Sequence, residues 1–533
     1  MPYFQITSLP SVTLKTDGTP ARLGSVSVEA NPLPNTAEGE KVVVLDVQNC
    51  AVASGIRGRN DPSPIQRLST ELLAEIFMFC VFDIKQSIGR FVGNKRTPIY
   101  LCRVCRNWRD VAFGLPGLWT SLSLNMGNIK PWQRKILPDL LNQWFTRSRH
   151  LPLTFKLTGS PSEALEPLSG LIHPYAHRFR HFDFPSPDLV CQVPPESHSA
   201  SSSPLGDLSW STLRFHELES AIIRDVISVY GDKDTPLFPY APRLQRIRMD
   251  NLSFIGPRIR PILPWSQMTH LVLGSFLEIH IWHQLFPMCP NLQHGFFRLC
   301  QGDNSEAPPT SQPVGHVVFN HLVELSLGFD VYMDVRVFSP FDFPALVTLT
   351  LIADAEDFLD KECFWTETDR RRCHQQLASV QRLCLNGEWP YDLLLEGMEQ
   401  VVELDLRYQF ENFDEEFLSY LRPDQDFILP NLKVLILELS HDGSAESEAN
   451  VIADIVKFRR STESSPEGGI EKLFVDLAGV YRRDTKIACK DALMGKLQPY
   501  FSDGFRLEIK DVDLRSRRLA PMATEWHDGM IDL

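Results

Sequence analysis

The residues that could do chemistry begin with two cysteines, Cys102 and Cys105, separated by two positions. This spacing is that of a zinc knuckle, in which two thiolates supply half of a tetrahedral metal site. No second cysteine pair or histidine pair follows at a matching distance, so the ligand set is incomplete. Cys105 also falls on an apolar stripe. We therefore predict structural cysteines, with no metal and no cofactor.

A second group is His280 and His283, which would lie one helical turn apart. Two imidazoles at this spacing can bind a metal, but no acid or cysteine stands nearby at a familiar spacing. We interpret them as a partly buried structural pair. The chain also lacks a phosphate-binding loop, a glycine-rich dinucleotide turn, a nucleophile elbow and a His-Glu-x-x-His helix. These absences predict that the chain has no catalytic residues and is not an enzyme.

A third group is the basic run at residues 369–372 (DRRR), which lies close to Cys363, Cys373 and His374. Adjacent arginines can hold a phosphorylated or acidic target through charge-assisted hydrogen bonds. Charge runs are more commonly solvated faces of helices. A solvated helix face is our interpretation, and recognition of an acidic target is the alternative.

The bulk properties limit the class of protein. A chain of 533 residues is too long for one hydrophobic core, and 43% hydrophobic with 23% charged residues is typical of a globular protein. The net charge of −14 argues against nucleic-acid binding and against a polybasic membrane anchor. No run of 18 apolar residues or secretory signal is present, and the 11 cysteines are scattered. We expect a cytoplasmic or nuclear protein with no nucleic-acid and no membrane partner.

The composition and the residue pattern of the chain change twice, which divides it into three parts. Residues 1–62 are rich in Gly, Pro and Ser and are predicted to be flexible, with one candidate strand at 41–47. Residues 63–121 have helical periodicity. Residues 122–533 contain short apolar strands separated by turn signals and inserted loops.

In the helical part, Ser69 can cap a helix whose first turn contains Glu71. Apolar residues then recur at helical spacing, at Leu68, Leu72 and Ile76 and at Leu73 and Phe77. A second apolar stripe predicts another helix, ended by Gly114 and Pro116. Its members are Leu101, Val104, Cys105, Trp108, Val111 and Ala112.

This helical part resembles the F-box family. The segment 65–77 (IQRLSTELLAEIF) is similar to the opening helix of that family, and 101–109 (LCRVCRNWR) is similar to its later Val-Cys-basic-x-Trp segment. Leu118 and Trp119 match the trailing Leu-Trp pair. Ser69 replaces the usual proline, and the long gap at 81–100 is similar to the expanded form of mushroom-type fungal F-box proteins.

The resemblance implies that these helices bind a Skp-type linker protein and, through it, a cullin scaffold. By residue type and place, the linker-binding residues would be Leu68, Leu72, Leu73, Ile76, Phe77, Leu101, Val104, Cys105 and Trp108. Which of them face the partner and which form the core of a small domain stays open at this point. A domain of about 50 residues has little core of its own, so an apolar surface that needs a partner is physically reasonable.

The third part repeats one pattern, an apolar residue followed by apolar residues three and five positions later. Segments 119–124 and 153–157 also alternate as strands do. Repeat starts are 21 to 38 residues apart, and Pro242, Pro290, Pro344 and Pro430 each lie two residues before a start, where they would end a preceding helix. The pattern occurs at Phe179/Phe182/Phe184, Leu213/His216/Leu218, Leu244/Ile247/Met249, Met268/Leu271/Leu273, Leu292/Gly295/Phe297, Leu322/Leu325/Leu327, Leu346/Leu349/Leu351, Val380/Leu383/Leu385, Val401/Leu404/Leu406, Leu432/Leu435/Leu437 and Ile470/Leu473/Val475.

This pattern resembles leucine-rich repeats, with uneven repeat lengths. A strand that cannot bury its apolar side alone is stabilised by stacking on its neighbours. The expected fold is α/β, a small F-box-like helical domain followed by an irregular leucine-rich-repeat-like solenoid of parallel strands with helices and loops. Segments 195–209, 301–315, 440–450 and 461–469 are predicted to be loops on the rim.

Together the two resemblances imply an adaptor that recognises a substrate for a cullin-type ubiquitin ligase. The helices would bind the linker and the array would bind a target protein whose identity the chain does not reveal. The main alternative is an interaction scaffold of the same fold with no role in ubiquitination. A third possibility is an enzyme whose active site is built from the inserted loops.

Overall fold

The structure is a computed structural model, and it describes most of the chain from residue 64 to residue 510. The described residues are 64–82, 98–125, 137–158, 172–184, 213–224, 227–228, 238, 240–250, 252–253, 263–300, 316–330, 337–353, 366–386, 394–406, 421, 428–439, 445–461, 469–477, 480 and 482–510. The predicted flexible segment 1–62, its strand at 41–47 and the predicted loops 195–209 and 301–315 lie outside these residues.

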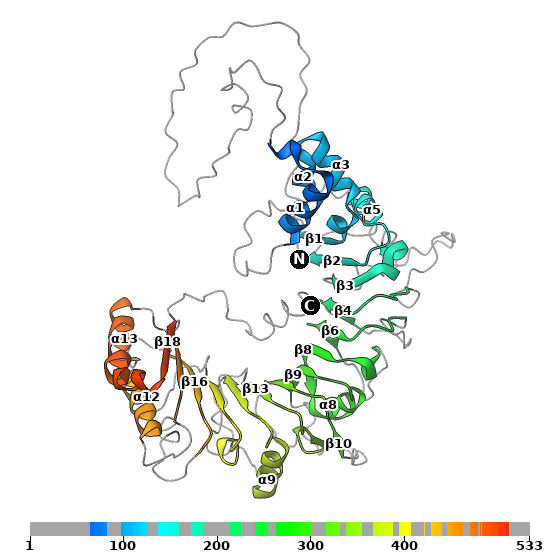
Figure 1. The fold of residues 1–533 in the computed structure, drawn as a ribbon. Coiled ribbons are helices and arrows are strands. Elements are labelled where there is room, and N and C mark those ends of the chain that lie inside the picture. Colours follow the sequence, from blue (N-terminus) through cyan, green and yellow to red (C-terminus); the bar gives the residue numbers. More distant parts are fainter. Residues whose placement is uncertain are drawn as a thin grey trace, which may run out of the picture.

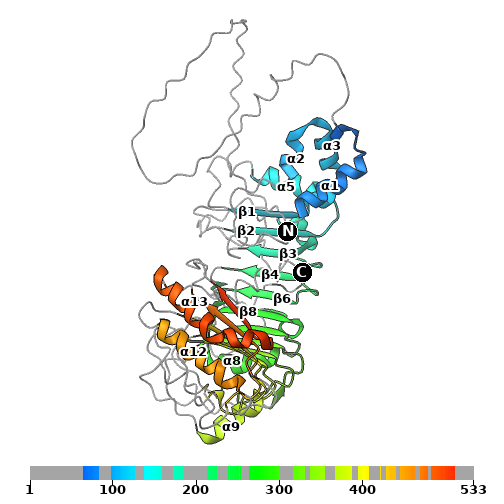
Figure 2. The same ribbon diagram turned by 60° about the vertical axis from the view of Figure 1, so that its left-hand side comes forward.

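The main element is a sheet of 14 strands that follow one another in chain order and pair in parallel throughout. Figure 1 shows these strands lining the inner side of an arc, and Figure 2 shows β1 to β8 stacked like rungs. The architecture is therefore a leucine-rich-repeat-like solenoid. Its strands are β1 (Ser121–Asn125), β2 (Leu153–Thr158), β3 (Phe179–Phe184), β4 (Ser220–Ile223), β6 (Arg246–Met249), β8 (His270–Glu278), β9 (His294–Cys300), β11 (Glu324–Phe329), β13 (Thr348–Ala353), β14 (Arg382–Asn386), β15 (Glu403–Leu406), β16 (Val434–Glu438), β17 (Lys472–Asp476) and β18 (Arg506–Lys510).

The register of the strands confirms the repeated apolar pattern. The middle apolar position of each repeat pairs with the middle position of the next, as in Leu325 with Leu349 and Leu349 with Leu383. These side chains are fully buried. Each leucine removed from water in this way contributes about 1.5–3 kcal/mol, so the stack of rows is the main source of cohesion.

One repeat was placed in the wrong register. The pattern at 213–218 predicts a strand with His216 at its centre, but the strand is β4, in which Ala221 and Ile223 pair with Ile247 and Met249. The true repeat therefore starts at Leu218, and a histidine is no longer required in an apolar row. The last strand, β18, was not predicted at all, although its Leu507 and Ile509 pair with Leu473 and Val475.

The prolines before the repeats have a different role from the predicted one. Pro242, Pro290, Pro344 and Pro430 each occupy the second position of a tight turn. In these turns the amide of the first apolar residue donates to the carbonyl three residues earlier, as Leu244 does to Ala241 and Leu346 to Phe343. Proline favours this position because its ring fixes φ at the value the turn needs. Each of these turns directs the chain into the strand that follows it.

Helices and two short ribbons form the outer layer. Figure 1 shows α8, α9, α12 and α13 on the outer side of the arc. The ribbons are β5 (Ile227–Ser228) with β7 (Leu252–Ser253), and β10 (Val317–Val318) with β12 (Phe341–Asp342). The helices are α5 (Leu137–Arg147), α8 (Ile279–Leu285), α9 (Glu367–Gln376), α12 (Ala445–Arg460) and α13 (Arg483–Leu497), with 3₁₀ turns η5 (Ala176–Arg178), η7 (Trp265–Gln267), η8 (Phe286–Met288) and η11 (Gln498–Asp503).

The loop predicted at 440–450 is wrong for its second half, because α12 begins at Ala445. Its Ser, Glu and Ala residues suggested an insertion. Alanine and glutamate are strong helix formers, and Ala449, Ile452 and Val456 place an apolar face in the core.

Four short elements precede the array, namely η2 (Pro64–Arg67), α1 (Thr70–Phe82), α2 (Pro98–Val104) and α3 (Arg106–Gly114), followed by η3 (Pro116–Trp119). The predicted cap of α1 is confirmed, since the Ser69 hydroxyl accepts the amide of Leu72 at 3.3 Å. The single helix predicted over residues 101–112 is wrong. It breaks at Cys105, whose extended backbone and thiol cap α3 by accepting the Trp108 amide. The Arg109 guanidinium donates to the Cys102 carbonyl at 2.9 Å, which satisfies the end of α2.

The helices are joined to the array through Trp119, which is fully buried. Its indole N–H donates to the Ala112 carbonyl of α3 at 2.8 Å, and its ring meets Trp144 of α5 edge to face at 4.8 Å. The helices and the first strands therefore share one continuous apolar core.

Gly295 explains why one repeat lacks an apolar middle residue. A side chain there would start 2.7 Å from the ring of Phe297 and 3.1 Å from Leu292. The Phe297 ring fills the space that a leucine occupies in the neighbouring repeats, because it packs against Trp282 and Phe286. The larger side chain of Phe297 therefore compensates for the missing side chain at Gly295.

Candidate interaction surfaces

The first candidate surface lies on α1, a helix that is apolar on both of its sides. Only three of its residues, Thr70, Glu71 and Glu75, are polar. One side, with Leu73 and Phe77, is buried in the core. A helix that is apolar all round normally has both sides covered. Here the second side stays exposed in the part of the chain that the structure describes.

The predicted linker-binding residues fall into three groups by exposure. Leu73 and Phe77 are buried, so they stabilise the helices and contribute no exposed surface. Leu72, Ile76 and Val104 are exposed by 54%, 41% and 59%. Half-buried positions form the third group, Leu68, Leu101, Cys105 and Trp108.

Three further side chains extend this surface and were missed from the sequence. Phe79 is 69% exposed, and Cys80 and Tyr100 are also exposed. Phe79 and Cys80 follow Leu72 at helical spacings of seven and eight, so periodicity alone could have found them. No sequence signal distinguishes Tyr100, which precedes the recognised segment of α2. We call Leu72, Ile76, Phe79, Tyr100 and Val104 the apolar face of the N-terminal helices.

Cys102 and Cys105 have structural roles. Cys105 caps α3 as described, and the Cys102 side chain is buried, which raises the pKa of its thiol. Within the described residues, no group of three or more His, Cys, Asp or Glu side chains is placed to hold a metal ion.

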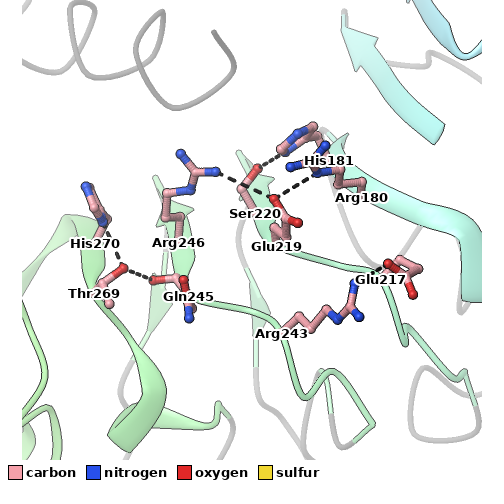
Figure 3. A network of polar contacts seen from close by, with 10 residues as sticks. All are labelled: Arg180, His181, Glu217, Glu219, Ser220, Arg243, Gln245, Arg246, Thr269 and His270. Atoms are coloured by element: carbon pink, nitrogen blue, oxygen red, sulfur yellow. Dashed lines mark hydrogen bonds and ion pairs between the residues drawn. The ribbon is translucent and has the colours of Figure 1, made fainter. Parts of the chain in front are cut away.

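The second candidate surface is a polar network on the inner side of the sheet, at the starts of β3, β4, β6 and β8 (Figure 3). The inner side follows from strand alternation, because Ile247 and Met249 enter the core and Arg246 projects the opposite way. His181 and Ser220 are joined by a hydrogen bond of 2.8 Å between Nδ1 and Oγ. Both are almost fully buried. A serine beside a histidine could form a nucleophile, but within the described residues this histidine has no carboxylate as a hydrogen-bond partner.

Charged residues continue the network. Glu219 lies between two arginines, 2.9 Å from Arg180 and 3.9 Å from Arg246. Farther along, the rings of His270 and His294 stack at 4.5 Å, and His294 Nδ1 lies 3.1 Å from Glu324. Polar side chains of neighbouring strands therefore contact one another between β3 and β4 and across β8, β9 and β11.

Burial lowers the pKa of His181 and of His270 from 6.5 to about 4. For His181, Arg180 and Arg246 lower it further and Glu219 opposes them. For His270, the neighbouring His294 acts in the same direction as burial. Both imidazoles are therefore neutral in the folded protein at physiological pH.

These shifts predict that acid destabilises the array. Because the folded pKa lies below the unfolded value, the unfolded state binds protons first as pH falls, and stability is lost between about pH 6.5 and pH 4. Replacing His181 with asparagine keeps an acceptor for Ser220 and removes one titrating group. We expect the drop in unfolding free energy from pH 7 to pH 4.5 to shrink by about 1–2 kcal/mol.

Urea titration at the two pH values measures this difference. His177→Asn, at an exposed position on η5, is the matched control and should leave the drop unchanged. An equal change in both variants would contradict the assignment to His181.

Next to this network, Asp183 is buried between two cations. Its carboxylate accepts two bonds from Arg224 at 3.1 and 2.9 Å, and Lys156 lies at 3.3 Å. A buried carboxylate needs such pairing, and the bidentate geometry fixes the spacing of β2, β3 and the end of β4. The arrangement stabilises the sheet, and its geometry leaves no open position for a reacting group.

The other residues singled out from the sequence are separate from both surfaces. His280 and His283 lie on α8, but the predicted partly buried pair is wrong, because His280 is exposed and each has its own partner. His280 lies 3.0 Å from Glu278, and the half-buried His283 lies 5.8 Å from the ring of Phe341. Cys373 is buried, which raises the pKa of its thiol to about 12. Cys363 lies outside the described residues.

No protein-family model and no curated protein sequence matches this chain. Several solved structures are similar to it, including these two. One is a Bacteroides fragilis protein, with 11% identity over 56% of this chain and 66% of that chain and a TM-score of 0.25. The other is TLR13 in its complex with ssRNA13, with 11% identity over 69% of this chain and 48% of that chain and a TM-score of 0.30.

This chain spans less than two thirds of the length of either protein, and both TM-scores are too low to assign a fold by similarity. The chain's own strands therefore define its fold. None of the helices in the described ranges has the length and apolar character needed to cross a bilayer. The molecule is a leucine-rich-repeat-like solenoid, a fold whose extended curved surfaces typically act as scaffolds for protein interactions.

Proposed function

We propose that this chain is a substrate-recognition adaptor of a cullin-type ubiquitin ligase. In this proposal the N-terminal helices act as an F-box that binds a Skp-type linker protein, and the array binds a target protein. The observation that supports it is the apolar face of the N-terminal helices, which combines the F-box-like sequence of segments 65–77 and 101–109 with strong exposure of Leu72, Phe79 and Val104.

The exposure of this apolar face supports a protein partner. Exposed aliphatic and aromatic side chains are costly in water when they are clustered, and such patches mark sites where another protein removes them from solvent. The opposite side of α1 is already packed on Trp108, whose ring lies 4.8 Å from Phe77. This packing fixes the position of α1, which favours binding of a partner without rearrangement of the helix.

The proposed mechanism is proximity. The adaptor holds a target near a ubiquitin-charged enzyme elsewhere in the complex and so raises its effective concentration. In this role the chain contributes geometry and no reactive groups, and it acts in the cytoplasm or nucleus, where cullin-type ligases would meet it. We propose the polar inner side and the outer grooves of the array as the surfaces available for the target.

The test is reconstitution of the full chain with a purified Skp-type protein, followed by alkylation with N-ethylmaleimide. Cys80 is exposed on α1 beside Phe79, whereas Cys289 is buried and its thiol pKa is raised to about 12, so Cys289 should stay unmodified throughout. We expect the linker to co-purify and to slow alkylation of Cys80 at least about tenfold, because the partner would cover this helix face.

Mass spectrometry measures the rate at each cysteine, and half-buried Cys300 on β9 is the internal control, which the linker should leave unchanged. If no linker co-purifies, or if Cys80 reacts at the same rate in the complex, the adaptor proposal fails. The solenoid would then remain an interaction scaffold without a role in ubiquitination. That second function predicts that deletion of the chain leaves the turnover of its partners unchanged.

A further inference from the structure

A groove on the outer side of the array separates the β10–β12 ribbon from α9. It has a volume of about 540 Å³ and is lined by residues from three segments far apart in sequence. They are His316 and Val318, then Asp342 to Pro344, then Arg372, Gln375, Gln376, Ala378 and Ser379. Its size is in the range of sites that bind small ligands or short peptide segments.

The three consecutive arginines of α9 differ in their partners. Arg370 is paired with Glu367 and with Glu396, and Arg371 Nε lies 2.7 Å from Glu367. Arg372 lines the groove and is exposed, and within the described residues it has no acidic partner. One guanidinium of the basic run is therefore available for an external anion.

The facing wall holds a histidine–carboxylate pair. Its only acidic side chain within the described lining, Asp342, is paired with His316 at 2.9 Å. Ser379 Oγ donates to the Phe343 carbonyl at 2.9 Å, which ties the turn after α9 to the ribbon and keeps the wall in place.

Gln376 is a second polar residue that lines the groove. Its side chain is only 7% exposed and lines the groove, and its Nε2 donates to the Ser339 carbonyl at 3.2 Å. Its amide oxygen Oε1 has no hydrogen-bond donor in the described part of the chain. A buried acceptor without a donor costs free energy, and because this oxygen is fully buried, a ligand N–H would reach it only after the Gln376 side chain turns toward the groove. Val318, 45% exposed, offers apolar contact beside it.

We propose that this groove binds an acidic peptide segment of another protein. An aspartate or glutamate side chain of the segment would pair with Arg372, and an apolar neighbour would pack on Val318. A backbone N–H of the segment would donate to Gln376 once that side chain turns toward the groove. An extended peptide presents a carboxylate, an amide and an apolar side chain within two or three residues, which matches the three features of the groove.

Other ligand classes fit less well. A nucleic acid requires several free cations, and in α9 the first two arginines are already neutralised by glutamates. The inference is independent of linker binding, because α9 and the N-terminal helices are separate elements. It holds equally for an adaptor and for a scaffold.

The experiment uses the full chain and a short peptide of alternating valine and glutamate, labelled with a neutral fluorophore. Fluorescence anisotropy should show saturable binding, which Arg372→Gln should weaken at least about tenfold, because a charge-assisted pair is lost. Arg371→Gln is the matched control on the same helix and should weaken binding less than about twofold, since its partner is Glu367. Arg372→Lys should restore part of the affinity because it keeps the charge.

Four results would overturn the proposal. The first is no saturable binding of the glutamate peptide at millimolar concentration. The second is equal weakening by Arg371→Gln and Arg372→Gln. The third is equal or tighter binding of a valine-lysine peptide. A phosphoserine peptide that binds where the glutamate peptide does not would also reject it, and would assign the groove to phosphorylated segments instead. Thermal unfolding checks that the exposed substitutions leave the fold intact.

Discussion

Replacement of Ile76 by aspartate is expected to abolish binding of a Skp-type linker while the array stays folded. Ile76 is 41% exposed and lies one turn from Leu72 on α1, so it would be near the centre of the covered surface. A carboxylate buried there without a partner costs several kcal/mol. We expect binding at least about 100-fold weaker, a loss of roughly 2–4 kcal/mol, measured by titration with the purified linker.

The matched control is Ile487→Asp on α13, at the far end of the solenoid. Ile487 is 47% exposed, so the same change is made to a side chain of similar exposure. It should leave linker affinity unchanged within about twofold. If Ile76→Asp binds as tightly as the unmodified chain, α1 is not the contact surface.

Substitution of Trp108 is a less specific test of linker binding than its place in the F-box-like segment suggests. By residue type and place alone, a charge at Trp108 would test linker binding as well as a charge at Ile76 does. The structure places the Trp108 ring against Phe77 at 4.8 Å, within the packing of the helices. A charged residue there would disturb the core as well as the surface, so loss of binding would have two explanations.

The largest loss of stability is expected from Arg459→Met. Arg459 is 3% exposed at the end of α12, and its guanidinium donates to three main-chain carbonyls, those of Leu421, Ile428 and Leu429, at 2.7 to 3.0 Å. Burial lowers its pKa to about 10, so it is still charged at neutral pH. Methionine has a similar length but no donor, so all three carbonyls lose their side-chain donor, and Leu429 keeps only the turn bond from the Leu432 amide. We expect the unfolding free energy to fall by about 3–5 kcal/mol, measured by urea denaturation.

Lys457→Met is the control for the loss of charge, because Lys457 is exposed in the same last turn of α12. It should change the unfolding free energy by less than about 1 kcal/mol. Comparable losses in the two variants would show that positive charge at the helix end matters, and that the carbonyl bonds do not.

The repeated apolar pattern was sufficient to predict the parallel sheet, because each repeat has a side that only a neighbour can bury. The pattern gave the correct register wherever its central residue was apolar or, at Gly295, where a phenylalanine fills the space. It failed at His216, where two overlapping patterns compete and only burial decides between them. It also missed β18, whose charged residues Arg506, Glu508 and Lys510 dominate a short segment.

The surfaces were harder to predict than the fold. Helical spacing cannot tell which side of α1 meets the chain's own core, since both sides are apolar, and packing on Trp108 decides it. The groove beside α9 joins residues 316, 342 and 372, which are brought together by stacking of repeats of unequal length. The three arginines of α9 look equivalent in sequence, and only the positions of Glu367 and Glu396 distinguish Arg372.

The last strand, β18, has consequences for how copies of this molecule meet. Its outer edge has no strand partner among the described residues, and such edges can recruit another chain. If two copies paired there in antiparallel fashion about Glu508, Glu508 would face its own counterpart and Arg506 would face Lys510. Every directly opposed charged pair would then be repulsive. We infer that this alternation of charge disfavours pairing of two copies through their β18 edges.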